Sequence, residues 1–464
     1  MARHAMSSMD AAWLHMDGPA HPAVVNGLVL TAKPLDAEAL GYVLRNRLLH
    51  FDRFRQRVVE PALGLGLPQW EDVEDIDLDD HLHLLALPHT PRSTAADRER
   101  ALAHLVADIA SQPLPRDRPL WQAHLIDRGR SGAAFMLRYH HCLGDGLAMM
   151  NVAGALFDPA AHSLRWGPPP PLAVAPPPSP LAIVFEALQH PQQGLHAAEQ
   201  VMDGAQVLLH DLLIPPDPPS PMKGEFGVRQ AVAWSSGFEL SDIKDVAWPF
   251  HATVNDVLVA CVAGALRHYL KHRGIDLRHR TLRAVVPVNL RPAEHRGQLS
   301  NEFGLALLAL PIEEDNPVQR VTLTQERMAQ LKHSTEPVAM QWLCKLLGHG
   351  PKPLQDQVQA LLGSKASVVL SNLAGPRQRL YLAGRAVDRL MFWVPHPGDT
   401  LGMGLSLLSY RGQITLGVMA DAQLVPDPQW IADAFVHELE ALIARYHSAV
   451  NRREHTEPGH SPAR

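Results

Sequence analysis

Cysteine is scarce in this chain of 464 residues, which contains only Cys142, Cys261 and Cys344. These three cysteines lie far apart in the sequence, and their spacing fits neither a disulfide framework nor a zinc site. We therefore expect a reducing compartment and a cytoplasmic location.

Long hydrophobic runs are also missing. The longest apolar stretches, residues 257–266 and 305–312, are shorter than the roughly 20 residues that a transmembrane helix needs. The opening residues MARHAMSSMDAAW lack the apolar core of a signal peptide. We expect a chain that does not cross a membrane, and peripheral association with a membrane or lipid inclusion stays open.

A strong excess of charge of one sign is absent as well. The formal net charge is −6, and no basic stripe is visible that would bind a phosphate backbone. We expect no nucleic-acid partner. Hydrophobic residues make up 46% of the chain, and its length allows two domains with a sizeable core each.

Proline is abundant in two segments near the middle of the chain. Residues 166–181 read WGPPPPLAVAPPPSPL and residues 214–222 read IPPDPPSPM, with a helical pattern over 181–213 between them. Proline continues neither helices nor central strands, so these segments are interpreted as extended linkers. The sequence predicts an N-terminal domain over 1–165, a linker over 166–227, a C-terminal domain over 228–450 and a disordered tail over 451–464.

Strand and helix patterns alternate in both predicted domains. Residues 23–30 and 135–141 have the pattern of strands, and residues 36–49, 95–111 and 430–446 have that of helices. The acidic residues 71–88 are interpreted as a solvated surface loop. Alternating strands, helices and hairpins of this kind indicate an α/β sandwich rather than an all-helical body.

The most informative stretch is residues 135–154, FMLRYHHCLGDGLAMMNVAG. A strand ends at His140 and His141, and a short loop leads to Asp145, which can cap a following helix that begins at Gly146. Adjacent strand residues point to opposite faces, so one histidine faces a cleft while the other packs into the scaffold.

A histidine is the natural group to take a proton from a hydroxyl or thiol and to return it to a leaving group. We assign His141 as this base, His140 as its support, and Asp145 as an anchor that holds the turn through a charge pair. Three alternatives remain open for this stretch: a metal site formed by the two histidines and the aspartate, a nucleophilic role for Cys142, and a purely structural motif.

The pattern HHxxxDG resembles the motif of the CoA-dependent acyltransferase superfamily, which includes chloramphenicol acetyltransferase and peptide-synthetase condensation domains. Agreement elsewhere narrows the resemblance to the bacterial wax ester synthase/diacylglycerol acyltransferase family. The matching segments run in the family's order over about residues 9–446 and read MDAAWLHMD (9–17), DLDDH (77–81), PLW (119–121), NDV (255–257), PVNLR (287–291), SNLAGP (371–376) and AD with LVPD (420–427). Departures are few: Cys142 stands where the family more often has alanine, and Leu373-Ala374 replaces a more usual Val-Pro.

The resemblance implies two similar chloramphenicol-acetyltransferase-like domains, each a mixed sheet flanked by helices, with the active site at their interface. It implies transfer of a fatty acyl group from acyl-CoA to a diacylglycerol or long-chain alcohol, with no cofactor besides acyl-CoA as co-substrate and no resident metal. The resemblance also implies substrate-binding roles for Asn255, Ser371 and Asn372, and structural roles for Asp256 and Arg291.

Thr253 and Asp256 have capping-box spacing, which leaves Asn255 in the first turn of a helix. Asn255 is therefore a candidate oxyanion donor, with a helix-end hydrogen bond as the alternative. We expect Asp145 to pair with Arg291.

Competing functions are acyl transfer to a sugar or polyketide hydroxyl, a carrier-dependent condensation reaction, and an inactive relative that coats lipid inclusions. Residues 340–347 have one apolar face, which suits either core packing or an interfacial helix.

Overall fold

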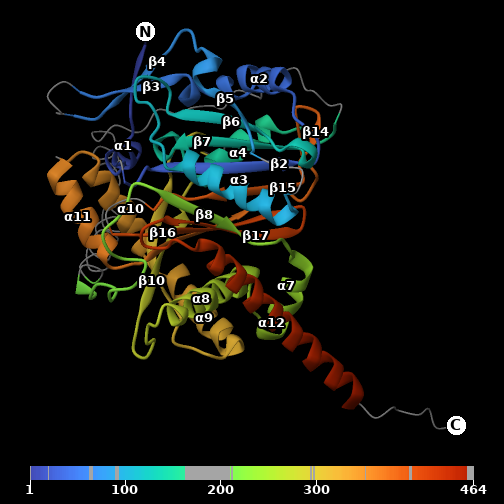
Figure 1. Cartoon of the computed structure of the whole chain (residues 1–464). Helices are drawn as coiled ribbons and strands as arrows, with labels where there is room; N and C mark the ends of the chain where they lie inside the picture. The colour runs from blue at the N-terminus through green and yellow to red at the C-terminus, as the bar shows by residue number, and fades with distance from the viewer. Residues whose placement is uncertain are drawn as a thin grey trace.

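The computed structural model of the chain contains two large mixed β-sheets that lie next to each other, with helices packed on both (Figure 1). The structure describes residues 2–18, 20–61, 66–88, 93–161, 210, 213–292, 295, 298–350, 352–396 and 400–456. The predicted α/β fold with mixed sheets is confirmed.

The first sheet contains one parallel pair, β5 with β6, among otherwise antiparallel strands. Its strand order is β15 (Arg389–Trp393), β2 (Val24–Thr31), β7 (Ala133–His140), β6 (Trp121–Asp127) and β5 (Leu82–Ala86). The strand β5 corrects the interpretation of residues 71–88 as a loop throughout. Its partner β6 lies some 40 residues further along the chain, so local patterning does not reveal the pairing.

The second sheet has parallel pairing on both sides of β12 and antiparallel pairing elsewhere. Its strand order is β11 (Phe303–Leu310), β10 (Leu282–Asn289), β12 (Val368–Ala374), β16 (Met403–Tyr410), β17 (Gln413–Asp421) and β8 (Gln230–Trp234), with β9 (Phe238–Glu239) also paired to β17. Two smaller sheets are formed by β1 (Arg3–Ala5), β4 (Gln69–Asp72) and β3 (Gln56–Val59), and by β13 (Tyr381–Leu382) with β14 (Arg385–Ala386).

One strand crosses between the two halves of the chain. β15 belongs by sequence to the second half, yet it pairs antiparallel with β2 along its whole length, from Arg389 opposite Leu30 to Trp393 opposite Asn26. The first sheet is therefore completed only by residues that follow most of the second sheet. The sequence did not indicate this crossing.

The helices begin where the sequence places capping residues. Asp36 caps α2 (Ala37–Asn46), Asp145 caps α4 (Gly146–Leu156), and Thr253 with Asp256 forms the predicted capping box of α8 (Val254–His272). The remaining helices are α1 (Ser8–His15), α3 (Ala95–Ala110), α7 (Leu240–Ala247), α9 (Pro317–Lys332), α10 (Glu336–Leu347), α11 (Lys352–Ser364) and α12 (Pro428–Thr456).

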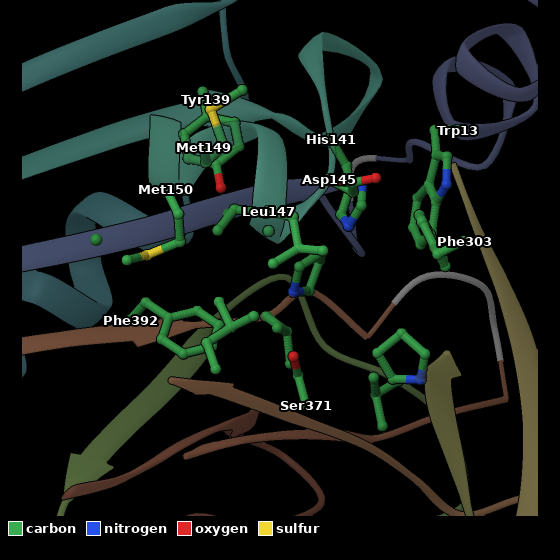
Figure 2. A pocket seen from close by; sticks show the side chains of 18 of the residues that line it. Trp13, Tyr139, His141, Asp145, Leu147, Met149, Met150, Phe303, Ser371 and Phe392 are labelled. Carbon is green, nitrogen blue, oxygen red and sulfur yellow. The ribbon is translucent and has the colours of Figure 1, made fainter. Parts of the chain in front are cut away.

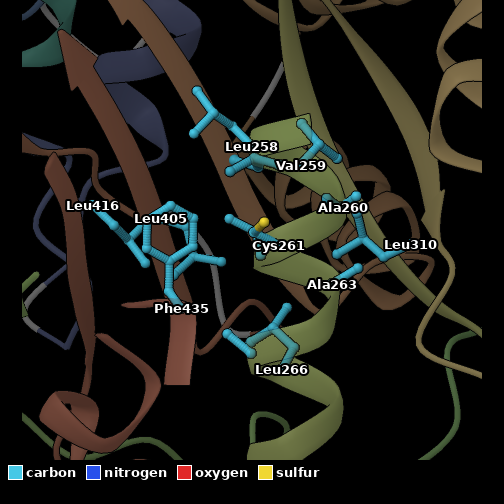
Figure 3. Close-up of a cluster of buried hydrophobic side chains, with 14 of the residues drawn as sticks. Leu258, Val259, Ala260, Cys261, Ala263, Leu266, Leu310, Leu405, Leu416 and Phe435 are labelled. Atoms are coloured by element: carbon cyan, nitrogen blue, oxygen red, sulfur yellow. The ribbon is translucent and has the colours of Figure 1, made fainter. Parts of the chain in front are cut away.

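Helix α8 lies at the centre of the core of the second half. Its buried side chains Leu258, Cys261 and Leu266 share one hydrophobic cluster with side chains of β16, β17 and α12, such as Leu405 and Phe435 (Figure 3). In the described part of the chain, no single helix is long and apolar enough to cross a membrane. The bent pair 240–250 and 254–272 reaches the required length and composition, but α8 is almost entirely buried in the protein.

Two predictions about the linker and the tail can be compared with the structure. The whole proline-rich segment 166–181 and most of the predicted helix 181–213 lie outside the described residues. The part over 214–222 has neither helix nor strand but is anchored, because the Asp217 carboxylate accepts hydrogen bonds from the Arg283 backbone at 2.8 Å and the Ser367 hydroxyl at 2.7 Å. The tail prediction is wrong for 451–456, because α12 continues to Thr456.

Candidate functional site

A cavity of about 400 Å³ lies between the two sheets (Figure 2). This volume falls in the range of about 300–1,000 Å³ that is usual for small-molecule sites. Both halves of the chain line it, mainly with apolar side chains: the first half contributes Trp13, Val25, Leu137, Tyr139, Met149 and Leu156, and the second half contributes Pro287, Phe303, Leu305, Leu373, Leu401 and Leu408. Such walls suit a long aliphatic group.

The strand β7 divides its side chains as its alternation predicts. Phe135, Leu137 and Tyr139 line the cavity, while the alternate residues point to the other face of the sheet. The backbone leaves the strand after His140, so the next residue, His141, reaches the cavity from the loop at the end of the strand.

His141 points into the cavity and is held between aromatic rings (Figure 2). Its imidazole stacks on the Trp13 indole with 3.8 Å between ring centroids and 10° between planes. The Phe303 ring lies on another side, with a centroid distance of 5.8 Å. These contacts restrict the ring to one orientation.

The Nδ1 atom of His141 lies 3.2 Å from Oδ1 of Asn301. The Nδ2 atom of Asn301 donates to the His141 carbonyl at 2.9 Å, and a carbonyl can only accept. The amide oxygen must therefore face the imidazole, which places the proton of the neutral ring on Nδ1. The lone pair on Nε2 is then left for a ligand in the cavity.

Burial lowers the pKa of His141 from 6.5 to about 4. A hydrogen bond to its own backbone carbonyl, the negative charge of Asp145 and the contact with Asn301 act in the opposite direction, but they do not outweigh burial. The imidazole is therefore uncharged at neutral pH and can accept a proton.

His140 is buried on the side of the sheet that faces away from the cavity, as predicted for one of two adjacent histidines. Its Nδ1 accepts a hydrogen bond from the Cys142 backbone at 3.1 Å, and its Nε2 lies 3.7 Å from a carboxylate oxygen of Asp17. Burial alone would raise the pKa of Asp17, but the nearby His140 imidazole and the hydrogen bonds from the Ala23 backbone and Arg116 bring this pKa to about 2. His140 thus pins the loop that carries His141.

Asp145 ties the motif to the second half of the chain. One oxygen caps α4 by accepting from the Ala148 backbone at 2.9 Å. The other accepts from Arg291 at 2.7 Å and from the Glu302 backbone at 2.9 Å. The expected pair of Asp145 and Arg291 is therefore present, and both side chains are buried.

Gly146 also lines the cavity, at the first residue of α4. A Cβ atom at this position would lie 3.0 Å from a methyl carbon of Leu373, which is closer than such atoms normally approach. A side chain at this position would clash with the cavity wall, which explains on steric grounds why the motif has glycine here.

The structure brings Ser371 and Asn372 to the cavity but not Asn255. The amide oxygen of Asn255 accepts a hydrogen bond from Nδ2 of Asn372 at 2.7 Å, so Asn255 reaches the cavity wall through its neighbour. Asp256 has the predicted structural role, since its Oδ2 accepts from the backbone and hydroxyl of Thr253. An oxyanion-donor role for Asn255 stays a prediction.

Two alternatives for the motif receive no support. Cys142 is fully buried, and burial raises the pKa of its thiol well above 9.0, which opposes thiolate formation. No group of three His, Cys, Asp or Glu side chains in the described residues has the geometry to hold a metal ion.

Sequence reasoning gave no role to Trp13, Asn301, Asp10 or Asp17. Trp13, Asp10 and Asp17 fall in residues 9–17, which were noted only for the family resemblance. Their roles follow from tertiary contacts around the two histidines. These contacts join residues that are far apart in the sequence, and a single sequence gives no sign of them.

Comparisons with known proteins agree with this geometry. A family model described as the wax ester synthase/diacylglycerol acyltransferase catalytic domain matches residues 6–258, and one described as the WS/DGAT C-terminal domain matches residues 299–443. A Mycobacterium tuberculosis H37Rv protein named "Probable diacyglycerol O-acyltransferase tgs1" is 27% identical to this chain and is matched over 97% of both proteins.

Two solved structures share the fold over almost the whole chain. The wax ester synthase/diacylglycerol acyltransferase from Marinobacter aquaeolei VT8 is 23% identical, with a TM-score of 0.68, covering 96% of this chain and 99% of that one. The first condensation domain of the calcium-dependent antibiotic synthetase is 18% identical, with a TM-score of 0.62, covering 96% and 97%. These matches confirm the predicted fold of two acyltransferase-like domains.

Proposed function

The chain belongs to the wax ester synthase/diacylglycerol acyltransferase family, and from this premise we propose that His141 is the general base of its acyl transfer. The enzyme is an O-acyltransferase that forms triacylglycerol or wax ester from a fatty acyl group and a diacylglycerol or long-chain alcohol. Acyl-CoA is the donor in this proposal, and no further cofactor takes part.

The observation that carries the proposal is the placement of one imidazole. His141 points into an apolar cavity shared by both halves of the chain, with Nδ1 engaged by Asn301 and the ring uncharged at neutral pH. A base with this tautomer presents its Nε2 lone pair to a hydroxyl group in the cavity.

The reaction follows from that lone pair. Nε2 takes the proton of the acceptor hydroxyl as its oxygen bonds to the thioester carbonyl carbon, giving a tetrahedral oxyanion. The intermediate collapses by breaking the carbon–sulfur bond, and the imidazolium returns its proton to the departing thiolate of CoA. Thioester and alcohol are held in one site, so no acyl-enzyme is required.

Groups that bind the substrates are proposed on the opposite wall of the cavity. Ser371 is buried on β12, lines the cavity, and offers its hydroxyl as a donor to the developing oxyanion. Asn372 lies next to it, and Asn255 orients the Asn372 amide through their 2.7 Å hydrogen bond. In this arrangement Asn255 supports substrate binding without contacting the reacting atoms.

The central test replaces His141 with glutamine. Loss of a general base typically reduces the rate by about 100- to 10,000-fold, so His141→Gln is expected to release almost no thiol from palmitoyl-CoA when hexadecanol or dipalmitoylglycerol is added. The matched control is His50→Gln, an exposed residue at the end of a short helical turn, which is expected to keep wild-type activity. Full activity of His141→Gln would contradict the proposal.

The same assay separates the competing functions. Acceptor-dependent thiol release excludes an inactive inclusion-coating protein, and product analysis with lipid and sugar acceptors in parallel distinguishes ester lipids from acylated sugars. A wild-type protein that releases no thiol with either lipid acceptor would refute the proposed reaction.

We also propose that the enzyme associates peripherally with the lipid surface from which its substrates come. Helices α10 and α11 support this, because they wall the cavity on their inner side with Met340, Cys344 and Leu362. Their outer side carries exposed apolar residues: Val338, Trp342 and Leu346 on α10, with Leu354 and Leu361 on α11. The two interpretations of residues 340–347, core packing and interfacial contact, thus apply to opposite faces of one helix.

Flotation with phosphatidylglycerol–phosphatidylcholine vesicles tests this association. Trp342 is 57% exposed and Leu346 is 70% exposed, so Trp342→Glu/Leu346→Glu places two charges on the lipid-facing side without removing core contacts. This variant is expected to lose most vesicle binding. The matched control is Trp248→Glu, since Trp248 is 81% exposed on a separate helical turn. Equal binding of both variants would contradict a role for α10 and α11.

A further inference from the structure

Asn301 contacts three groups that come from two separate elements of the chain, the loop at His141 and the helix α1. Its Nδ2 donates to the His141 carbonyl at 2.9 Å and to Oδ1 of Asp10 at 2.8 Å, while its Oδ1 lies 3.2 Å from Nδ1 of His141. The Asn301 amide is buried, and these contacts engage both its nitrogen and its oxygen. If the amide were flipped by 180°, the only acceptor within reach of its N–H groups would be the ring nitrogen. The orientation seen in the structure is therefore strongly favoured.

Asp10 is the residue that accepts the second hydrogen bond from the Asn301 amide nitrogen. It lies on α1 and is almost completely buried, one helical turn before Trp13. Residues three apart on a helix share a face. α1 therefore acts on the catalytic imidazole twice, on its face through the Trp13 stack and on its edge through Asp10 and Asn301.

We propose that Asn301 is a positioning residue that keeps the His141 proton on Nδ1, and that Asp10 is the acceptor that fixes the Asn301 amide. This inference rests on the proposed function, because it specifies how the general base is held in its reactive form. Neither residue contacts the reacting atoms. With the amide reversed or absent, the proton can move to Nε2, and the ring then has no lone pair to offer the acceptor hydroxyl.

A purely structural role would give a different result. The contacts of Asn301 also tie α1 to the start of β11, so a loss of activity alone does not separate positioning from stability. The charged and titratable groups around the imidazole are Asp145 with its partner Arg291, His140 on the preceding residue, and Asp10 beyond Asn301, with the Arg53 guanidinium acting on Asp10. The test variant has to change the group at Nδ1 and leave Asp145, Arg291 and His140 in place.

The sharpest variant exchanges the two side chains, Asp10→Asn with Asn301→Asp. The new amide at position 10 can donate to the new carboxylate at position 301, so the contact between them is kept while an anion is placed against Nδ1–H. The hydrogen bond to the His141 carbonyl is lost, because a carboxylate cannot donate. An opposite charge within about 4–6 Å favours the protonated ring, so the acid limb of the kcat/KM profile is expected to move up by about one pH unit or more. If the role of Asn301 is only structural, the exchange variant is expected to have a lower Tm and an unchanged acid limb of the kcat/KM profile.

The matched control is Asn26→Ala. Asn26 is also a buried asparagine, and it lies on β2, where it donates to the Val24 carbonyl and accepts from Arg138 away from the main cavity. This variant is expected to lose stability and to keep the wild-type acid limb. An exchange variant whose limb coincides with that of Asn26→Ala would overturn the proposal.

A second measurement does not depend on activity. In ¹⁵N-histidine-labelled protein, the imidazole signals that are missing from His141→Gln report the His141 ring. We expect a protonated Nδ1 and an unprotonated Nε2 in the wild type, and a higher titration midpoint in the exchange variant. A proton found on Nε2 would overturn the positioning role even in an active enzyme, whereas the expected tautomer in a protein without acyl transfer would refute only the proposed function.

Single variants at position 10 complete the test if the exchange variant does not fold. Asp10→Asn keeps an oxygen acceptor and is expected to hold kcat within about threefold, while Asp10→Ala removes the acceptor and is expected to lower kcat about tenfold at an unchanged KM. Equal kcat values for the two variants would overturn the role of Asp10.

Discussion

Trp13 and His141 stack face to face, with 3.8 Å between their ring centroids and 10° between their planes. Trp13 lies on α1 near the beginning of the chain, and its ring also contacts Phe303 of β11 at a centroid distance of 5.9 Å. The indole is therefore both a wall of the cavity and the surface against which the base is held. Its face also favours a positive charge, so it can stabilise the imidazolium formed during the reaction.

Replacing Trp13 with alanine is expected to reduce both stability and turnover. Removal of a buried aromatic side chain costs about 3–5 kcal/mol of unfolding free energy and frees the imidazole to rotate. Trp13→Phe keeps an aromatic face and is expected to retain most of kcat. Urea unfolding and kcat with palmitoyl-CoA and hexadecanol measure both effects, and Trp248→Ala is the exposed tryptophan control.

Replacing Asp145 with asparagine tests its structural role. Asparagine can still cap α4, but the buried Arg291 loses its nearer carboxylate and keeps only Glu302 at 3.8 Å. The side chains of Asp145 and Arg291 are only 8% and 4% exposed. Breaking one side of a buried ion pair typically costs about 3–5 kcal/mol. We expect a lower Tm with activity lost in proportion to the folded fraction. A variant with wild-type Tm and no activity would give Asp145 a direct catalytic role instead.

The loop around His141 could be predicted from sequence because its determinants are local. The alternation of β7, the cap at Asp145 and the separation of the two histidines all depend on residues within about two turns of each other. The pair of Asp145 with Arg291 came from the family resemblance. Contacts of Asn301, Asp10 and Asp17 did not follow, because each joins segments that are distant in sequence and whose residue types are common on surfaces.

The same distinction applies to the fold. The strand at 23–30, the histidine strand and the helices over 36–49, 95–111 and 430–446 were predicted because their hydrophobic periodicity is strong. The arrangement in two sheets came from the family resemblance. β15 was missed because a short strand with no regular alternation, RLMFW, gives no sign of which sheet it joins. α11 was also missed, and Gln355 is its only buried residue.

The activity is expected to decline in acid because His141 must be unprotonated to act as a base. Its pKa of about 4 predicts a kcat/KM profile that is level near neutral pH and falls about tenfold per unit below pH 4. A stopped assay in overlapping buffers with constant ionic strength measures this limb. A midpoint near 6.5 would indicate that the imidazole is more solvated than the cavity implies.

Unfolding free energy is expected to fall over a related range. Burial lowers the pKa of His141 to about 4 and those of His124 and His396 to about 3, against 6.5 in an unfolded chain. Between 6.5 and these values the unfolded state binds more protons, so stability is complete above 6.5 and declines as pH falls. Urea midpoints measured from pH 7 to 5 check this, with the variant His396→Gln expected to show a shallower slope.

Removal of metal ions is expected to have no effect on turnover. The proposed reaction needs only an imidazole and hydrogen-bond donors, and none of the described residues form a three-ligand metal cluster. Enzyme dialysed against EDTA and assayed in chelated buffer should keep its wild-type kcat. A loss of activity that is restored by a divalent cation would contradict this expectation.

The return of the chain through β15 has a consequence for biogenesis. The histidine loop leaves the ribosome early, but the open edge of β2 has no neighbour until residue 393 has been synthesised, roughly 250 residues later. An unpaired strand edge is prone to associate with other chains. A truncated polypeptide that ends before this strand would carry the entire HHxxxDG sequence and yet aggregate, so neither half is expected to work as an independent module.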